Sequence, residues 1–152
     1  MLHLHSFLRW IVIILAVAAV LKSLSGLLSK RSFAASDRKI SLFFMISMDI
    51  QLLVGLVLYF TGAWGIKNIQ NNGMASVMKD PAGRFFAVEH TIGMVLAIAA
   101  AHIAHSAAKK ALGDQAKFRK VFLFSLISLI IMLAMIPWPS RELVGRALFP
   151  GM

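Results

Sequence analysis

Four long apolar stretches follow one another along the chain, and shorter polar segments separate them. A helix that spans a bilayer needs about 20 mostly apolar residues. The pattern therefore predicts four spanning helices, over residues 2–21, 40–63, 85–108 and 121–138. The last stretch stops at Pro137 and Pro139, because proline has no N–H to donate to a helix. Short connections make consecutive helices antiparallel neighbours. We therefore expect an all-α membrane protein, an antiparallel up-down four-helix transmembrane bundle that forms one domain over residues 1–152.

The connection between the second and third stretches is the longest. Turn-forming residues mark two points in it, Asn71-Asn72-Gly73 and Pro81-Ala82-Gly83. Residues 74–79 lie between these turns and could form a short helix, but we expect an ordinary surface loop. After the fourth stretch, the tail 140–152 is expected to rest at the outer membrane surface, with its large apolar side chains among the headgroups.

Composition supports a membrane protein. Of the 152 residues, 59% are hydrophobic and 14% are charged, whereas about a quarter of a soluble domain is charged. The net charge of +10 could suggest a nucleic-acid partner, but the cations gather in the connections. Connections 22–39 and 109–120 hold five Lys or Arg each, connection 64–84 holds three and the tail holds two. Because cytoplasmic loops carry the excess of cations, we expect 22–39 and 109–120 in the cytoplasm, both termini outside, and no nucleic acid.

The chain has no cysteine, which excludes disulfides, iron–sulfur clusters and covalently attached c-type haem. A bound metal would have to rely on histidine, methionine or carboxylate ligands. The sequence also contains no P-loop, dinucleotide-binding glycine motif, nucleophile elbow or zinc-protease motif. The residues to be explained are the ionisable ones inside the apolar stretches: Arg9, Asp49, Glu89, His90, His102 and His105. Hydrocarbon does not solvate such groups, so each is a functional candidate.

The third stretch carries three histidines, His90, His102 and His105. At 3.6 residues per turn, His90 and His105 lie about 60° apart around the helix, whereas His90 and His102 lie about 120° apart. One face can thus hold an imidazole near each membrane surface, as a bundle with two stacked b-type haems requires. His5, or else His3, could supply a second ligand opposite His90. The alternative is that these histidines are only polar groups near the membrane surfaces, and for His105 alone we favour it.

Asp49 lies near the middle of the second stretch. It is either a proton-relay carboxylate or one half of a structural ion pair, and Arg9 is the only cation in the hydrophobic zone. Arg9 could equally pair with Glu89, which lies at a similar depth. On another face of the second helix, Gln51 could hold helices together and Gly55 could allow a close approach.

Four segments of the chain resemble those of a family of small four-helix bacterial membrane proteins that is usually labelled cytochrome b-like. They are Leu2–Trp10 (LHLHSFLRW), Gln51–Phe60 (QLLVGLVLYF), Phe85–His90 (FFAVEH) and Ile136–Pro139 (IPWP). The resemblance covers essentially the whole chain. It implies b-type haem in the bacterial inner membrane, with His5 and His90 as ligands on the outer side. On the inner side it implies His102 or His105 as ligand.

We therefore expect an electron-transfer protein that works within the membrane, with a quinone as a candidate partner. In this hypothesis His5 and His90 bind the haem iron, and Arg9 neutralises a haem propionate. Glu89 orients His90 or handles protons. A second hypothesis is a non-catalytic subunit or assembly factor of a larger respiratory complex, or a homo-oligomer, whose polar residues fix the helix register. A third is a proton-coupled carrier that uses Asp49, Glu89 and His90 as its proton-binding groups.

Overall fold

The computed structural model of the protein describes residues 1–149, and all regular structure within them is helical. Four long helices are joined by short loops and by a group of short helices. The bounds are α1 Leu2–Leu28, α2 Ala35–Thr61, α3 Ile66–Asn72, α4 Met74–Lys79, α5 Pro81–Arg84, η1 Phe85–Glu89, α6 His90–Lys109 and α7 Asp114–Met135. The segment η1 is a π-helix, and it continues directly into α6.

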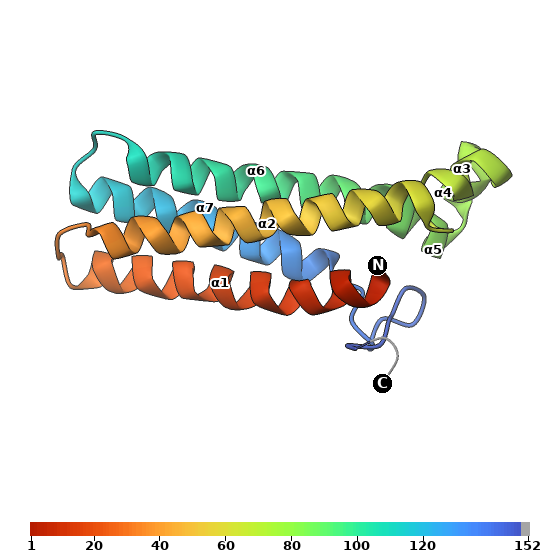
Figure 1. The fold of residues 1–152 in the computed structure, drawn as a ribbon, viewed down its shortest axis with the longest axis horizontal. Coiled ribbons are helices and arrows are strands. Elements are labelled where there is room, and N and C mark those ends of the chain that lie inside the picture. Colours follow the sequence, from red (N-terminus) through yellow and green to blue (C-terminus); the bar gives the residue numbers. More distant parts are fainter. Residues whose placement is uncertain (150–152) are drawn as a thin grey trace.

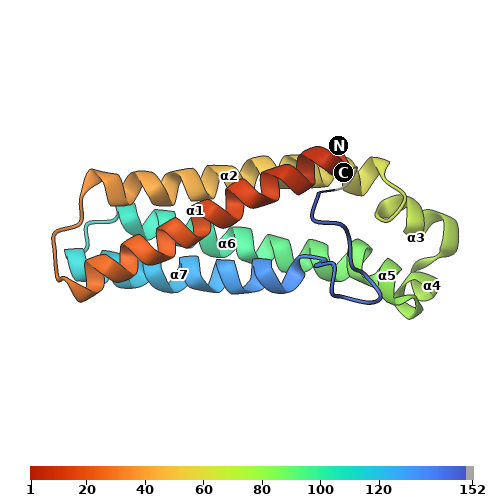
Figure 2. The ribbon, with the colours of Figure 1, turned by 90° about the horizontal axis from the view of Figure 1, so that it is seen from below.

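The four long helices lie side by side along the molecule (Figure 1). Each packs mainly against two others, in the ring order α1, α2, α6 and α7, so that α1 and α6 lie diagonally across the interior. The N-terminus, the short helices α3 to α5 and the tail segment 136–149 gather at one end, which we name the terminal end (Figure 2). Loops 29–34 and 110–113 lie at the opposite end, which we name the loop end.

Small side chains are common inside the molecule, and large apolar side chains cover its outside. The buried core contains many small residues, among them Ala16, Ala19, Ala97 and Ala101. Large apolar side chains are exposed on all four long helices, for example Ile14, Leu53, Leu96 and Ile130. Small residues let helices approach closely, and an outer surface of large apolar side chains suits hydrocarbon rather than water. All four helices are long and apolar enough to cross a membrane.

Each predicted span overlaps one long helix, but the helix ends differ from the ends of the apolar stretches. α1 continues to Leu28, α2 begins at Ala35 and α7 begins at Asp114. Hydropathy marks the part of a helix that can lie in lipid, and polar residues continue the same helix beyond that part. Helix α7, by contrast, is shorter than expected at its end. It stops at Met135 rather than at residue 138, because Pro137 has no N–H to donate to a continuing helix.

The connection between α2 and α6 is not the surface loop that we expected. Residues 66–84 form α3, α4 and α5 one after another. Gly73 makes the turn between α3 and α4 with φ of 77°, a conformation that glycine adopts without strain. Asp80 caps α5 by accepting the Gly83 N–H at 2.7 Å, and Pro81 takes the first position of that helix. Helices this short are not stable alone, so packing rather than hydrophobic periodicity determines them.

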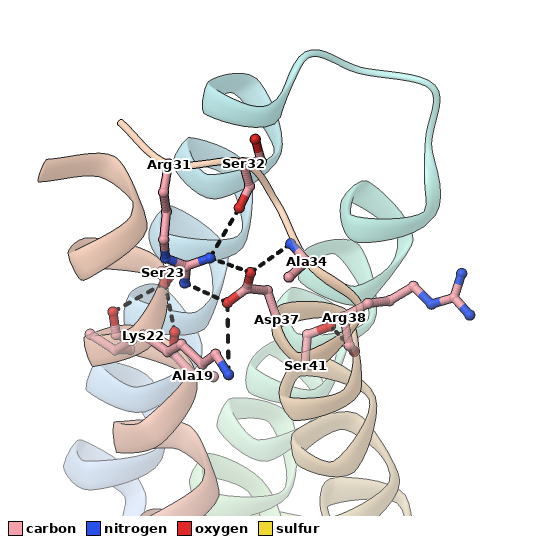
Figure 3. A network of polar contacts seen from close by, with 10 residues as sticks. Ala19, Lys22, Ser23, Arg31, Ser32, Ala34, Asp37, Arg38 and Ser41 are labelled. Carbon is pink, nitrogen blue, oxygen red and sulfur yellow. Dashed lines mark hydrogen bonds and ion pairs between the residues drawn. The ribbon is translucent and has the colours of Figure 1, made fainter. Parts of the chain in front are cut away.

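A polar network fixes the loop end (Figure 3). Arg31 donates two hydrogen bonds to the carboxylate of Asp37, at 2.6 and 2.7 Å, and Lys22 lies 3.9 Å from the same carboxylate. Asp37 also accepts the backbone N–H of Ala34 at 2.8 Å, next to the first residue of α2. The hydrogen bond to Asp37 raises the pKa of the Arg31 guanidinium, because the carboxylate stabilises its charged form. The network therefore ties loop 29–34 to both of the helices that it joins.

Candidate functional site

The two histidines predicted as haem ligands face each other in the interior at the terminal end. His5 lies near the start of α1, and His90 is the first residue of α6, so the two side chains come from helices that lie diagonally in the ring. The centroids of the two imidazole rings are 6.3 Å apart, and the ring planes are inclined by 66°. His3, by contrast, is exposed. Of the two histidines at the start of α1, His5 is therefore the one that lies opposite His90.

The π-helix and the end of α7 position His90. The five residues Phe85–Glu89 form the π-helix directly before it, and such segments are rare and frequently occur at functional sites. Nδ1 of His90 lies 2.8 Å from the backbone carbonyl oxygen of Met135. Because a carbonyl oxygen only accepts, Nδ1 donates a proton to this bond, and in the neutral ring Nε2 keeps its lone pair. Gly93 leaves the space that the Met135 side chain occupies, since a Cβ at Gly93 would collide with it.

Helix α2 positions His5. The side-chain amide of Gln51 donates to the backbone carbonyl oxygen of His5 at 2.9 Å. One turn further along α2, Gly55 leaves space beside the imidazole, and a Cβ at this position would lie 3.3 Å from Cε1 of His5. The expectation that Gln51 holds helices together and that Gly55 allows a close approach is confirmed.

Buried polar atoms without a partner gather in this region. Within residues 1–149 no hydrogen bond is made by Nδ1 of His5, Nε of Arg9, Nε1 of Trp10 or Oε1 of Gln51. Buried polar atoms in folded proteins nearly always have a partner, so a group of unpaired ones needs an explanation. His5 and Arg9 are four residues apart and share one face of α1, and Gln51 contacts the same part of that helix. His5, Arg9 and Gln51 therefore bring unpaired polar atoms to the same part of the molecule.

Arg9 is buried, but it makes neither of the ion pairs that we expected. Its Nη2 donates to the backbone carbonyl oxygen of Leu148 at 2.6 Å. The ion pairs formed within residues 1–149 do not include Arg9, because Asp49 and Glu89 have other partners. A buried guanidinium with an unpaired Nε can still bind an anion, and a carboxylate matches its planar shape best.

Glu89 does not orient His90, so that expectation is wrong. Its carboxylate accepts a hydrogen bond from Nε of Arg84 at 2.7 Å, and both side chains are partly exposed. The carbonyl of Met135 orients His90 instead. Glu89 lines an open hollow of about 360 Å³ at the terminal end, together with Phe85 and other residues. The reason is that adjacent side chains on a helix do not face each other, so Glu89 points away from the imidazole of the next residue.

The other candidate residues lie between α2 and α6. Nε2 of His102 lies 2.8 Å from Oδ1 of Asp49, and both side chains are partly exposed. His105 is buried, and its Nδ1 lies 3.0 Å from the hydroxyl of Ser41. Asp49 thus pairs with His102 rather than with Arg9, because the rotation of both helices brings His102 next to it. The residues that the structure describes contain one pair of facing imidazoles, His5 and His90, and neither His102 nor His105 has such a partner.

Haem suits the donor set at the terminal end better than a bare metal ion does. Within residues 1–149 no group of three or more His, Cys, Asp or Glu could hold a metal ion. Two imidazoles alone leave a metal ion short of ligands, whereas a porphyrin supplies nitrogens of its own and needs only axial ligands. His5 and His90, whose ring centroids are 6.3 Å apart, are the residues that could hold such a group.

Sequence reasoning missed the carbonyl of Met135 and the tail residue Leu148, which contact His90 and Arg9. Both are backbone acceptors, which any residue type provides, so no sequence signal could have identified them. The chain as a whole was also compared with known proteins. No family model matches it, and neither a curated protein nor a solved structure does.

Proposed function

We propose that the protein is a b-type haem protein of the bacterial inner membrane, built as an antiparallel up-down four-helix transmembrane bundle with both termini outside. It passes electrons within the membrane, and a quinone is its proposed partner. One observation carries the proposal: His5 and His90 face each other across the interior with ring centroids 6.3 Å apart. The resemblance of the same segments to cytochrome b-like membrane proteins points in the same direction.

In this proposal His5 and His90 hold the haem iron. The hydrogen bond from Nδ1 of His90 to the Met135 carbonyl fixes the ring orientation and makes Nε2 the basic nitrogen. Gln51 fixes the backbone of His5, and Gly55 keeps the space beside its ring open. Haem b supplies reversible one-electron chemistry when bound.

Arg9 is the proposed partner of a haem propionate. It lies one turn from His5 on the same helix, it is buried, and its Nε is unpaired within residues 1–149. A carboxylate at this position would accept a charge-assisted hydrogen bond, which is stronger than a neutral one. Glu89 lies at the open hollow, where water can reach it, and is the proposed point of proton exchange at the terminal end.

Haem content tests the proposal. The protein purified in detergent, supplied with haemin during expression, is expected to show a Soret band and a pyridine haemochrome spectrum of b type. His5→Ala and His90→Ala are each expected to lower the haem content per protein at least about tenfold, because the iron loses an axial ligand. His3→Ala is the matched control, since His3 is exposed near the same helix start and is expected to keep wild-type haem content.

Two further measurements separate ligand loss from misfolding. His5→Gly and His90→Gly leave a space that free imidazole can enter, so added imidazole is expected to restore the absorption spectrum of a folded variant. A helical circular dichroism spectrum equal to that of the wild type shows that the bundle is intact. A wild-type preparation that is colourless and stays colourless with added haemin contradicts the proposal.

A further inference from the structure

Asp49 and His102 form a polar pair on the outside of the seam between α2 and α6. Nε2 of His102 lies 2.8 Å from Oδ1 of Asp49, and the side chains are 48% and 40% exposed, respectively. Within residues 1–149 neither Oδ2 of Asp49 nor Nδ1 of His102 makes a hydrogen bond. The pair therefore presents a free carboxylate oxygen and a free ring nitrogen to its surroundings.

The depth of Asp49 makes this exposure unusual. The residue lies near the middle of α2, about 20 Å from each end of the helix at 1.5 Å per residue. In the membrane arrangement proposed above, the exposed pair faces the hydrocarbon, where ionisable side chains are rare and mark functional sites. Its surroundings are apolar, because Ile46, Ile50 and Ile103 are also exposed on α2 and α6.

A second hydrogen bond between α2 and α6 is buried, in contrast to the exposed pair of Asp49 and His102. Ser41 and His105 form it with both side chains buried, two turns away along α2. Interhelical hydrogen bonds of this kind hold membrane helices together. Holding α2 against α6 does not require an exposed carboxylate and an exposed imidazole, so the exposure of Asp49 and His102 indicates a ligand that arrives from the bilayer.

We propose that Asp49 and His102 bind the headgroup of a lipid-soluble hydroquinone. This inference rests on the proposed function, to which it adds the place where the quinone partner binds. A hydroquinone diffuses within the hydrocarbon, and its hydroxyl group can both donate and accept a hydrogen bond. The hydroxyl donates to Oδ2 of Asp49, while Nε2 of His102 donates to Oδ1 and holds this carboxylate in place. Ala99 lies one turn before His102 on α6 and is also exposed, so the neighbouring side chain on that face is only a methyl group.

Binding of decylubiquinol, a short-chain hydroquinone, tests the site. Wild-type protein in detergent is expected to bind it in a calorimetric titration, and a photoreactive azidoquinone is expected to label peptides of α2 and α6. Asp49→Leu and His102→Leu are each expected to weaken binding at least about tenfold. The first removes the acceptor of the headgroup hydroxyl, and the second removes the hydrogen bond that holds this acceptor in place. Ser106→Ala, an exposed polar position one turn further along α6, is the control and is expected to bind as the wild type does.

Leucine is chosen because it is favourable in hydrocarbon, so these variants are not expected to lose stability there. Unchanged resistance to unfolding by sodium dodecyl sulfate together with lost binding supports the site. Leucine variants that bind decylubiquinol like the wild type, or a wild type that does not bind it, overturn the inference. The inference is also overturned if the wild type forms dimers that the leucine variants do not form, and if no protein binds decylubiquinol. That result would assign this face to a second copy of the chain.

The haem measurement keeps the two proposals apart. A preparation that binds decylubiquinol through Asp49 and His102 but takes up no haem supports this site and contradicts the electron-transfer function. A haem-loaded preparation that does not bind decylubiquinol contradicts this site and leaves the haem ligands His5 and His90 in place.

Discussion

Gly55 shows at the scale of a single residue how a missing side chain shapes the site. A Cβ there would lie 3.3 Å from Cε1 of His5, which is tight contact, and any longer side chain would enter the space of the imidazole. We expect Gly55→Ala to keep most of the haem binding and Gly55→Leu to lower the haem content at least about tenfold, because it displaces a ligand. Haem content per purified protein measures both.

The control for this prediction is Gly113→Leu, because nothing lies within 4 Å of a Cβ at Gly113. This variant is expected to keep the haem content of the wild type. If Gly55→Leu also binds haem normally, His5 is not held where the proposal needs it, and another residue must supply the second axial ligand.

The identities of the two facing histidines could be predicted from the sequence, whereas the partners of the charged residues could not. His5 and His90 lie at the same end of two long apolar helices, so the position of each residue along its helix was enough to bring them to the same level. The pairing of Asp49 with His102 depends on how α2 and α6 are rotated relative to each other, whereas the pairing of Glu89 with Arg84 depends on the π-helix that follows Arg84. A rotation of about 100° accompanies each residue, so a single irregular turn such as the π-helix is enough to change a partner.

At the scale of elements, Asp37 determines how α1 and α2 are joined. Its side chain is 4% exposed and binds Arg31, the Ala34 N–H and Lys22. Asp37→Ala leaves the guanidinium and a backbone donor without their acceptor, so we expect a loss of about 2–4 kcal/mol in the free energy of unfolding. Reversible unfolding in mixtures of mild detergent and sodium dodecyl sulfate measures it.

Asp114→Ala is the matched control, because Asp114 is also acidic, starts a long helix at the loop end and forms no ion pair within residues 1–149. Its expected cost is below about 1 kcal/mol, which is the contribution of an exposed acid at a helix start. Equal losses for Asp37→Ala and Asp114→Ala would show that the contacts of Asp37 contribute no more than its charge does.

The long elements could be predicted from the sequence because their signal is a run of apolar residues about as long as a bilayer is thick. The short helices α3 and α4 have no such signal. They have seven and six residues, too few to show a hydrophobic period, and they are stable only where they pack against the rest of the chain. The polar ends of α1 and α2 were missed for a related reason, since hydropathy detects lipid contact rather than helix geometry.

For the whole molecule, the distribution of cations predicts a direction across the membrane. Loop 29–34, loop 110–113 and the helix ends beside them carry ten of the sixteen Lys and Arg residues, in the segments 22–39 and 109–120. The terminal end carries fewer, in segment 64–84 and in the tail. Short loops rich in Lys and Arg stay in the cytoplasm, so the loop end is expected inside and the terminal end outside.

The absence of native cysteine makes this orientation directly measurable. Asn71→Cys places a thiol at an exposed position of α3, at the terminal end. Ser32→Cys places a thiol at an exposed position of loop 29–34, at the loop end. Neither substitution removes a charge. In cells whose outer membrane is permeabilised, a membrane-impermeant maleimide is expected to label Asn71→Cys at once. It should label Ser32→Cys only after the inner membrane is opened. The reverse order of labelling would place His5 and His90 near the cytoplasm and would contradict an outward-facing haem.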